Sequence, residues 1–529
     1  MNKITEKNSQ NRQWLFFAFL ATFIWGLAAH AYCFTQNNFS HDSLKEFNGA
    51  IYGNTWKIEL GRFVVPVYRA VFRTDLTLPW LIGVLSLLWI GLAVYFAIRI
   101  FHFESKITGF LTAGIFTVNI TVTATAATYL HDFDCDMFAL FCAVLAAYLW
   151  SEICWGALPG AVLAAIVLGI YQSYISVTIV LVMFVCILAL MDGESFKNVL
   201  VKGLKAVGMI LLGGILYYVT VKMTLRAADT ALVTGEYNSL YMMFRLTPAK
   251  AVSLVGEVYR IFLERLLNVL SAYPDGMVKG ITILLLLLSA GIMAFALGNK
   301  VLRARERLLC LCLIALLPLG MNLSHVLTLG VSHDLMVYAI WLFYLLPLLL
   351  AEWLAKQIKR GNAAAVSKKH LGASKAAKYA SMVLVFVLLY GNVQLSNSVY
   401  LKKDQEHDAY LSLMTRVVYK MEDHEAYNSE TPVVFVGLSD QLLRAIPGFE
   451  KYSKITGVWS TDVLDSAERA RYQAYFDYVL IKPMWLADDA VWNEMQSDPR
   501  VNAMPCYPND GCIAVIDNVM VVKLGESIE

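Results

Sequence analysis

The feature that most constrains this chain is a series of long apolar runs. A helix needs roughly 20 apolar residues, or about 17 at the short end, to cross a bilayer. Eleven runs meet that length or approach it, at residues 14–34, 79–101, 107–129, 137–154, 156–171, 174–191, 206–225, 279–298, 308–327, 335–354 and 377–395. The chain is 58% hydrophobic and only 16% charged, whereas a soluble globular protein is about 25% charged. These features predict a mostly α-helical, polytopic membrane protein with about eleven transmembrane helices.

The positions of Lys and Arg give this bundle an orientation, because basic residues concentrate in cytoplasmic loops. They cluster in alternate loops, at residues 3–12, 99–106, 197–205, 300–307 and 356–378. The short loops of the opposite set, around 130–136, 171–174 and 328–334, contain none. We therefore expect a cytoplasmic N-terminus. With eleven spans, the segment after the last run lies outside the cell membrane.

The polar segment 396–529 reads as a small extracytoplasmic α/β domain that follows a transmembrane domain over residues 1–395. Strands are predicted at 432–438, 478–482, 512–517 and 519–524, and helices at 439–446 and 460–476. Asp517 and Asn518 suit a hairpin turn between the last two strands. Cys506 and Cys512 flank a turn with Pro and Gly, and an oxidising exterior would allow them to form a disulfide.

Two longer outer loops, 35–78 and 226–278, belong to the transmembrane domain. The second contains an amphipathic segment in which Thr247 is a candidate N-cap and Pro248 occupies the first helical position. Val252, Val255, Tyr259 and Phe262 fall on one face of this segment. We expect the helix to lie flat on the outer leaflet.

Ionisable residues gather on the predicted outer side. Asp42 and Glu46 follow the first apolar run, and the same loop carries Lys57, Arg62 and Arg69. The loop after the third run contains a second set, consisting of His131, Asp132, Asp134 and Asp136. At membrane depth such groups are costly and point to function. The alternative is that outer loops are acidic only because basic residues are kept inside.

Two further properties of the second set stay open. If 132–136 already begins a helix, Asp132 and Asp136 share a face and Asp134 points away. If it is extended, all three share a face. Three carboxylates at this spacing could also bind a divalent cation such as Mg²⁺ or Mn²⁺, although the Gly and bidentate Glu of an EF-hand loop are missing. His333 could bind a ligand or simply satisfy a helix end.

Several segments together resemble the GtrII-type membrane glucosyltransferases, which have a GT-C architecture and modify bacterial surface polysaccharide. They are "SHDSL" and "LGRF" in the first outer loop, "FDCDMFALFCAVLAAYL", "LGIYQSYISV", "HDLMVYA", and "PVVFVG" with "MPCYP-DGC" in the C-terminal segment. The resemblance implies sugar transfer at the outer face of the bacterial inner membrane. It implies a polyprenyl-phosphate sugar as donor, most specifically undecaprenyl-phosphate glucose, and a hydroxyl of O-antigen or a similar envelope glycan as acceptor.

The resemblance also suggests roles for individual residues. Asp42 is the expected general base or acceptor contact, although His41 stands where the family often has a second acid. Asp134 matches the family's second carboxylate, and Asp136 and Asp132 support it. Arg62 is the expected contact to the donor phosphate, with Lys57 and Arg69 as alternates. The remaining expected substrate contacts are Glu46, His131, Tyr171, Gln172 and His333.

This chemistry suits the residues independently. An acceptor hydroxyl needs a carboxylate to take its proton, a second carboxylate can stabilise an oxocarbenium-like transition state, and a phosphate leaving group favours Arg. If transfer inverts the anomeric centre, one base is enough. A lipid-linked glycan flippase or transporter is the main alternative, and it predicts charges buried within the spans and paired repeats. A net charge of +2 without a basic tract gives no reason to expect a nucleic-acid partner, and no feature indicates the oligomeric state.

Overall fold

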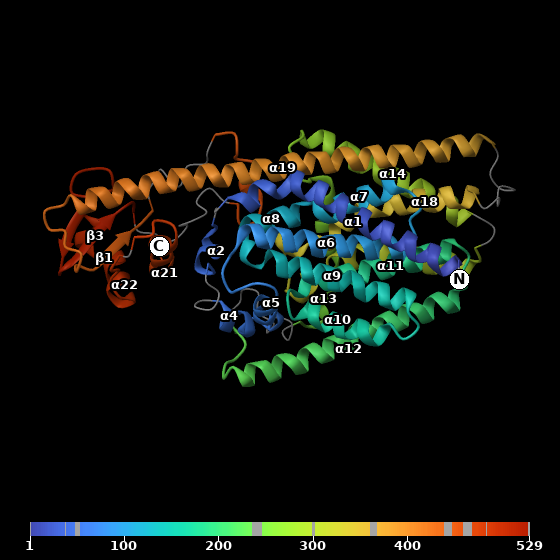
Figure 1. Ribbon diagram of the computed structural model, residues 1–529, viewed down its shortest axis with the longest axis horizontal. Helices are drawn as coiled ribbons and strands as arrows, with labels where there is room; N and C mark the ends of the chain where they lie inside the picture. The colour runs from blue at the N-terminus through green and yellow to red at the C-terminus, as the bar shows by residue number, and fades with distance from the viewer. Residues whose placement is uncertain are drawn as a thin grey trace.

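The computed structural model describes residues 2–36, 39–47, 53–234, 246–298, 302–359, 368–438, 447–458, 468–482 and 484–526. The protein is mostly helical, with 74% helix and 3% strand. Its long helices run side by side along the long axis of the molecule, and a small sheet lies at one end (Figure 1). The N-terminus lies at the opposite end of the bundle (Figure 1).

Eight helical segments of the described chain are long and apolar enough to cross a membrane. They are α1 (Asn2–Thr35), α6 (Pro79–Phe101), α9 (Leu130–Glu152), η1 with α11 (Gln172–Tyr174 and Ile175–Met191), α12 (Phe196–Ala227), α14 (Asp275–Gly298), α17 with η4 and α18 (Tyr338–Trp341, Leu342–Tyr344 and Leu345–Lys359), and α19 (Lys368–Glu422). A ninth candidate is the pair α7 (Lys106–Thr117) and α8 (Ile120–Thr128), which is bent by 40°. The structure therefore supports a polytopic membrane protein.

Each of the eleven predicted apolar runs falls on a helix, but two of these helices do not have the length or composition of a full span. Helix α10 (Ala157–Leu168) has only 12 residues, which corresponds to about 18 Å at 1.5 Å per residue. Helix α15 (Ala304–Met321) begins with Arg305, Glu306 and Arg307. The count of eleven thus depends on α10 and α15, and it stays a prediction.

Several further helices connect the candidate spans. In the first outer loop they are α2 (His41–Lys45), α4 (Asn54–Glu59) and α5 (Val64–Phe72), and further along the chain they are α13 (Pro248–Leu267), α16 (Leu323–Leu327) and η3 (Asp334–Met336). Helix α2 starts at a capping box, because the Ser40 side chain accepts from the Ser43 backbone and the Ser43 side chain accepts from the Ser40 backbone. Helix α13 starts as predicted, with Thr247 as its N-cap and Pro248 as its first residue.

The buried face of α13 differs from the prediction. Its buried residues are Leu254, Val258, Phe262 and Leu266, whereas Val252 is exposed. The helix packs against α14, α15 and α16. It therefore packs on the bundle through a face that differs from the predicted one, and its position on the outer leaflet stays a prediction.

The C-terminal segment forms a three-stranded sheet in the order β1-β3-β2, from β1 (Val433–Val436), β2 (Ile513–Ile516) and β3 (Val519–Lys523). β1 pairs with β3 in parallel, and β2 pairs with β3 as an antiparallel hairpin. Asp517 and Asn518 form the predicted turn, with φ of 50° and 62°, as a type I′ hairpin turn requires.

Three other predictions for this segment meet different outcomes. Residues 478–482 are not a strand, because α21 (Arg469–Tyr478) runs into them. The helix predicted at 439–446 and most of the first half of the helix predicted at 460–476 lie outside the described residues. The structure does not form the Cys506–Cys512 disulfide. It has both residues as thiols, with Cys506 Sγ donating to Glu526 and Cys512 buried directly before β2.

Helices α22 (Asp489–Ser497) and α23 (Pro499–Asn502) and the short η6 (Tyr452–Lys454) complete the fold.

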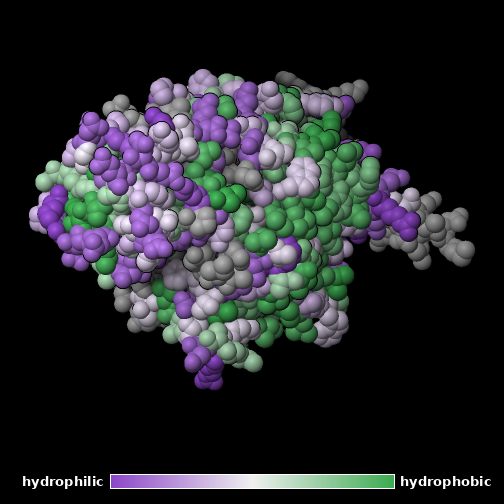
Figure 2. Space-filling view, turned by 60° about the vertical axis from the view of Figure 1, so that its left-hand side comes forward, coloured by the Kyte–Doolittle hydropathy of each residue, from purple (hydrophilic) through white to green (hydrophobic). Residues whose placement is uncertain are grey.

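The sheet and the bundle are joined by one continuous element. Helix α19 has 55 residues and passes the predicted domain boundary at 395–396 without a break, along the top of the view in Figure 1. Phe39 and Leu44 from the first outer loop are buried in the same apolar cluster as the strands. Hydrophilic side chains gather at this end, whereas a broad hydrophobic face covers the bundle (Figure 2).

Candidate active site

The candidate site forms where the first outer loop packs against the first turns of α9. Helix α9 begins at Leu130, so the acidic set belongs to the helix and the extended alternative is excluded. At helical spacing Asp132 and Asp136 share a face, and Asp134 points to another. Helices α4 and α5 supply the cations: Lys57 lies on α4 and Arg69 on α5.

Four of these side chains form a buried ion cluster, which we define as Glu46, Lys57, Arg69 and Asp132. Lys57 Nζ lies 2.6 Å from Asp132 Oδ2 and 3.4 Å from Glu46 Oε1. Arg69 Nη2 lies 2.8 Å from Asp132 Oδ1 and 3.0 Å from Glu46 Oε2. Each cation thus contacts both carboxylates. The cluster has no net charge, which allows it to be buried.

The cluster also lowers the pKa of the Glu46 carboxyl. Burial alone would raise the pKa of Glu46, but the opposing effect of the cations, led by Lys57, holds that pKa below its ordinary value. Glu46 is therefore ionised at neutral pH. Its role in the structure is to bind two cations, which differs from the substrate contact expected from the sequence.

Asp134 makes a separate ion pair on the other side of α9. Arg73 Nε donates to Asp134 Oδ2 over 2.9 Å, and neither side chain has exposed surface. Arg73 also donates to the backbone carbonyls of Thr74, Leu76 and His131. Sequence reasoning gave Arg73 no role, and nothing in its spacing distinguishes it from the other arginines of the loop. The pair ties the outer loop to α9.

Asp136 differs from the other acids of α9. It is half-buried, and within the described part of the chain its carboxylate has no hydrogen bond or ion pair. The cations that act on it electrostatically are Arg62 and Lys57. The guanidinium of Arg62 lies over the Tyr171 ring, 4.6 Å from its centroid. Asp136 thus differs from Asp132 and Asp134, which are each paired with a cation.

The short η1 helix also contributes residues to the site. Gln172 Nε2 donates to Tyr217 Oη over 3.1 Å, and Tyr217 lies on α12. The sequence gave no signal for Tyr217, because it sits in an ordinary apolar run. Buried polar atoms of Arg62 (Nε), Ser173 (Oγ) and Tyr174 (Oη) have no partner among the described residues, and such atoms can bind polar groups of a ligand.

The first outer loop contacts the C-terminal end of α10, next to the site. Helix α10 covers only about 18 Å of a hydrocarbon core that is about 30 Å thick, and Tyr171 follows its C-terminus. The first outer loop reaches this level, since Val64 N donates to Gly169 O over 3.0 Å. Phe63 and Val64 pack so closely on Gly169 that a larger residue there would clash.

The remaining predicted residues lie in different surroundings. Asp42, on α2, is half-buried and interacts electrostatically with Arg471 of α21. It therefore lies towards the C-terminal segment of the chain. His131 is buried, with Nε2 3.6 Å from Asp132 Oδ2. Burial lowers the pKa of His333, so its ring is neutral at pH 7.

Asp334, the neighbour of His333, connects three elements. Its carboxylate accepts from Arg265 of α13 and from the backbone and hydroxyl of Thr456, and its carbonyl accepts from Thr121 of α8 over 2.6 Å. Sequence reasoning did not give Asp334 a structural role. It anchors the segment 447–458 to the bundle.

The residues do not form an obvious metal site. Within the ranges that the structure describes, no three His, Cys, Asp or Glu side chains are placed to hold a metal ion together. Asp132 is paired with Lys57 and Arg69, and Asp134 with Arg73. The two carboxylates therefore do not face a common point at which Mg²⁺ or Mn²⁺ could bind both.

Comparison with known proteins places the chain in a family. A family model described as glucosyl transferase GtrII matches residues 31–350, which is more than half of the chain and includes every residue of the ion cluster. Comparison with curated proteins found no match, and comparison with solved structures found none. The match covers the first outer loop, α9, η1 and α12, which together build the site described above. The chain belongs to the GtrII glucosyl transferase family.

Proposed function

We propose that this protein transfers glucose from a polyprenyl-phosphate carrier to a hydroxyl of O-antigen or a similar envelope glycan, on the extracytoplasmic face of the bacterial inner membrane. The family supports glucosyl transfer, and the candidate spans support a membrane enzyme. The lipid donor, the glycan acceptor and inversion at the anomeric carbon are our proposals.

The observation that carries the proposal is the contrast among the acids of α9. Asp132 and Asp134 are committed to Lys57, Arg69 and Arg73, whereas Asp136 has no such partner in the described chain. A general base needs a carboxylate that is close to a substrate and not already neutralised by a protein cation. We therefore assign the base to Asp136 in preference to Asp42 and Asp134, which the sequence resemblance favours.

The proposed step conserves atoms and charge. The acceptor oxygen attacks the anomeric carbon, and its proton passes to the Asp136 carboxylate. The bond between the anomeric carbon and the phosphate oxygen breaks, and the phosphate leaves with the electron pair. Arg62 would stabilise the charge on that phosphate, and its stacking on Tyr171 holds the guanidinium in place.

The buried ion cluster would then have a supporting role. Lys57 and Arg69 hold Asp132 on α9, so the start of this helix is fixed relative to α4 and α5. Arg62 follows α4 directly along the chain, and its backbone N–H donates to Lys57 O over 2.7 Å. The cluster therefore positions the cation relative to the base.

A transfer assay with purified protein tests the proposal. Radiolabelled undecaprenyl-phosphate glucose would be supplied with a panel of lipid-linked glycans, with and without EDTA. We expect transfer by the wild type in both conditions, and a loss of about 10²-fold or more in Asp136→Asn. The variant Asp42→Asn is the matched comparison, since it removes another outer carboxylate, and it should retain more activity.

Other outcomes would redirect the assignment. Full activity in Asp136→Asn with loss in Asp42→Asn would move the base to Asp42. Loss in EDTA, restored by Mg²⁺ or Mn²⁺, would add a divalent cation to the site. If the folded wild type transfers no sugar from any polyprenyl-phosphate donor, the flippase alternative becomes the better explanation.

A further inference from the structure

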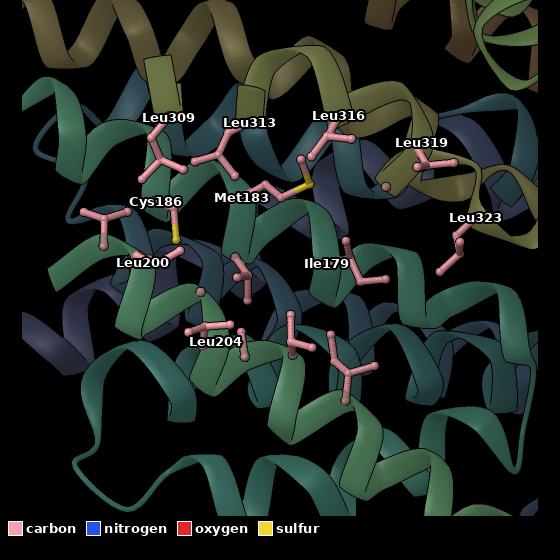
Figure 3. Close-up of a pocket in the computed structure, with 17 residues that line it drawn as sticks. Ile179, Met183, Cys186, Leu200, Leu204, Leu309, Leu313, Leu316, Leu319 and Leu323 are labelled. Atoms are coloured by element: carbon pink, nitrogen blue, oxygen red, sulfur yellow. The ribbon is translucent and has the colours of Figure 1, made fainter. Parts of the chain in front are cut away.

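An apolar groove runs along the bundle between α11, α12 and α15. Its cavity volume is about 420 Å³, and every side chain that lines it is apolar. Figure 3 shows Ile179, Met183 and Cys186 from α11 on one side, Leu200 and Leu204 from α12 on another, and leucines of α15 opposite. The nearest polar groups of these helices do not enter the groove.

The groove is open at the outer surface of the helix bundle. Leu204, Val207 and Leu316 line it and are 61%, 53% and 46% exposed. Along α15 the lining runs from Leu309 to Gly320, which is about 16 Å at 1.5 Å per residue. This is about half of a hydrocarbon core of roughly 30 Å. The shape fits an extended hydrocarbon chain that enters from the bilayer.

Elements that line the outer end of the groove contact elements of the candidate active site. At its outer end lie Leu323 of α16 and Ile179 of α11. Helix α16 packs against η1, which continues directly into α11. The residue before η1 is Tyr171, the ring on which Arg62 stacks.

Helix α12 also connects the groove with the residues of the candidate active site. Gly203 and Ile210 line the groove, and Tyr217 is the next residue at a spacing of seven, so the three share one face of the helix. Tyr217 accepts from Gln172 of η1. One helix face therefore leads from the groove to the polar residues around Arg62.

We propose that this groove binds the polyprenyl chain of the sugar donor, with the phosphate at Arg62 and the chain directed between α11, α12 and α15. The inference rests on the proposed function, because that function supplies the lipid-linked donor. A wholly apolar groove, whose wall elements contact η1 beside the residues around Arg62, suits a ligand with a long hydrocarbon chain and an anionic head. A phospholipid has an anionic head as well, and the competition experiment below distinguishes it from the donor.

Two glycines of α12 allow a matched test. A Cβ at Gly203, in the groove, or at Gly208, outside its lining, would meet no atom within 4 Å. Gly203→Phe should therefore fill the groove without a backbone clash. Gly208→Phe changes helix propensity by the same amount and leaves the groove open, so it is the control.

The measurement compares two donors that share the same unsaturated, cis first isoprene unit and differ in chain length, undecaprenyl-phosphate glucose and a neryl-phosphate glucose with two isoprene units. We expect Gly203→Phe to raise KM for the long donor at least tenfold and to leave KM for the short donor unchanged. Gly208→Phe should match the wild type with both. Equal KM values in Gly203→Phe and wild type for the long donor would overturn the groove proposal while the enzyme remains established. No transfer by the wild type from either donor would instead count against the proposed function.

A photolabelling experiment distinguishes the polyprenyl donor from an ordinary phospholipid as the ligand of the groove. A photoreactive undecaprenyl phosphate should label peptides of α11, α12 or α15 in wild type and Gly208→Phe, and labelling should fall in Gly203→Phe. An excess of unlabelled undecaprenyl phosphate should compete, and an excess of phosphatidylglycerol should not. If phosphatidylglycerol competes equally well, the groove holds ordinary membrane lipid and the proposal is wrong.

Discussion

At the scale of single residues, the three acids in the first turns of α9 differ in their partners among the described residues. Asp132 contacts Lys57 and Arg69, and Asp134 contacts Arg73. Removing one member of such a buried group leaves uncompensated charge and typically costs about 3–5 kcal/mol. Asp136 has no such partner in the described chain, so its loss should affect chemistry rather than stability.

This division predicts opposite effects for two neighbouring substitutions. Asp132→Ala should lower the free energy of unfolding by about 3–5 kcal/mol, because Lys57 and Arg69 would share only Glu46. Asp136→Asn should keep the wild-type unfolding midpoint and lose transfer. Thermal unfolding in detergent, measured beside the transfer assay, checks both. Equal destabilisation by the two variants would contradict the assigned roles.

The ion cluster also predicts a dependence of stability on pH. The pKa of Glu46 is lower in the folded protein than its ordinary value, so the unfolded chain binds a proton more readily. The stabilisation is therefore fully present above the ordinary value, about 4.5, and is lost as pH falls through the lower folded value.

Thermal unfolding from pH 7 to pH 3.5 measures this dependence. The wild type should lose stability over the acid end of the range, and Glu46→Gln, which cannot titrate at this position, should start less stable and show a shallower loss. An identical slope in both proteins would show that other carboxylates dominate.

The sequence predicted which residues belong to this site better than how they pair. Glu46, Lys57, Arg69 and Asp132 were all expected, because charged side chains near a membrane surface are few. Their pairing could not be predicted, since it depends on how α4 and α5 fold back onto α9. Asp42 was expected at the centre, but α2 turns it towards Arg471, which no local pattern indicates.

At the scale of elements, local patterns succeeded where a cap or a turn fixes the backbone. Thr247 with Pro248 and Asp517 with Asn518 were predicted correctly for this reason. Residues 478–482 look like a strand locally, yet α21 ends there, because tertiary packing overrides strand propensity. The sequence left open whether residues 132–136 begin α9, since the first turns of this helix carry charges that only tertiary ion pairs neutralise.

The segment 447–458 offers a prediction at this scale. Gly457 has a φ of +76°, and a Cβ there would clash with Thr128 at the end of α8. Gly457→Ala should therefore loosen the segment from α8 and Asp334. Limited trypsin digestion in detergent should show faster cleavage at Lys451 or Lys454.

Gly448 provides the control for that experiment. Its φ is +91°, but a Cβ there meets no atom within 4 Å, so Gly448→Ala has only the backbone strain of about 1–2 kcal/mol. Cleavage should rise more in Gly457→Ala than in Gly448→Ala. If the two variants are cleaved equally fast, the contact with Thr128 does not hold the segment.

At the scale of the whole molecule, hydropathy predicted the architecture more fully than any individual site. All eleven apolar runs are helical in the structure, because the bilayer leaves little choice for an apolar run of that length. Hydropathy does not reveal that α7 and α8 form a bent pair or that α10 stops short. The early end of α10 places Tyr171 and Gln172 in the break before α11, where they join the site.

The arrangement of the two ends predicts the topology of the chain. The N-terminus and the C-terminal sheet lie at opposite ends of the bundle (Figure 1), and Arg303, Arg305 and Arg307 stand at the start of α15, in a loop that positive charge should keep inside. Alkaline phosphatase depends on disulfides and is active only outside the cytoplasm. Fusions after Glu526 and after Asp229 should therefore be active, whereas a fusion after Leu302 should be inactive. A green fluorescent protein at the same three positions should give the reverse pattern. Activity after Leu302 would invert the bundle and place the ion cluster, Asp136 and the groove's outer end on the cytoplasmic side, where a nucleotide sugar could serve as donor in place of a lipid-linked one.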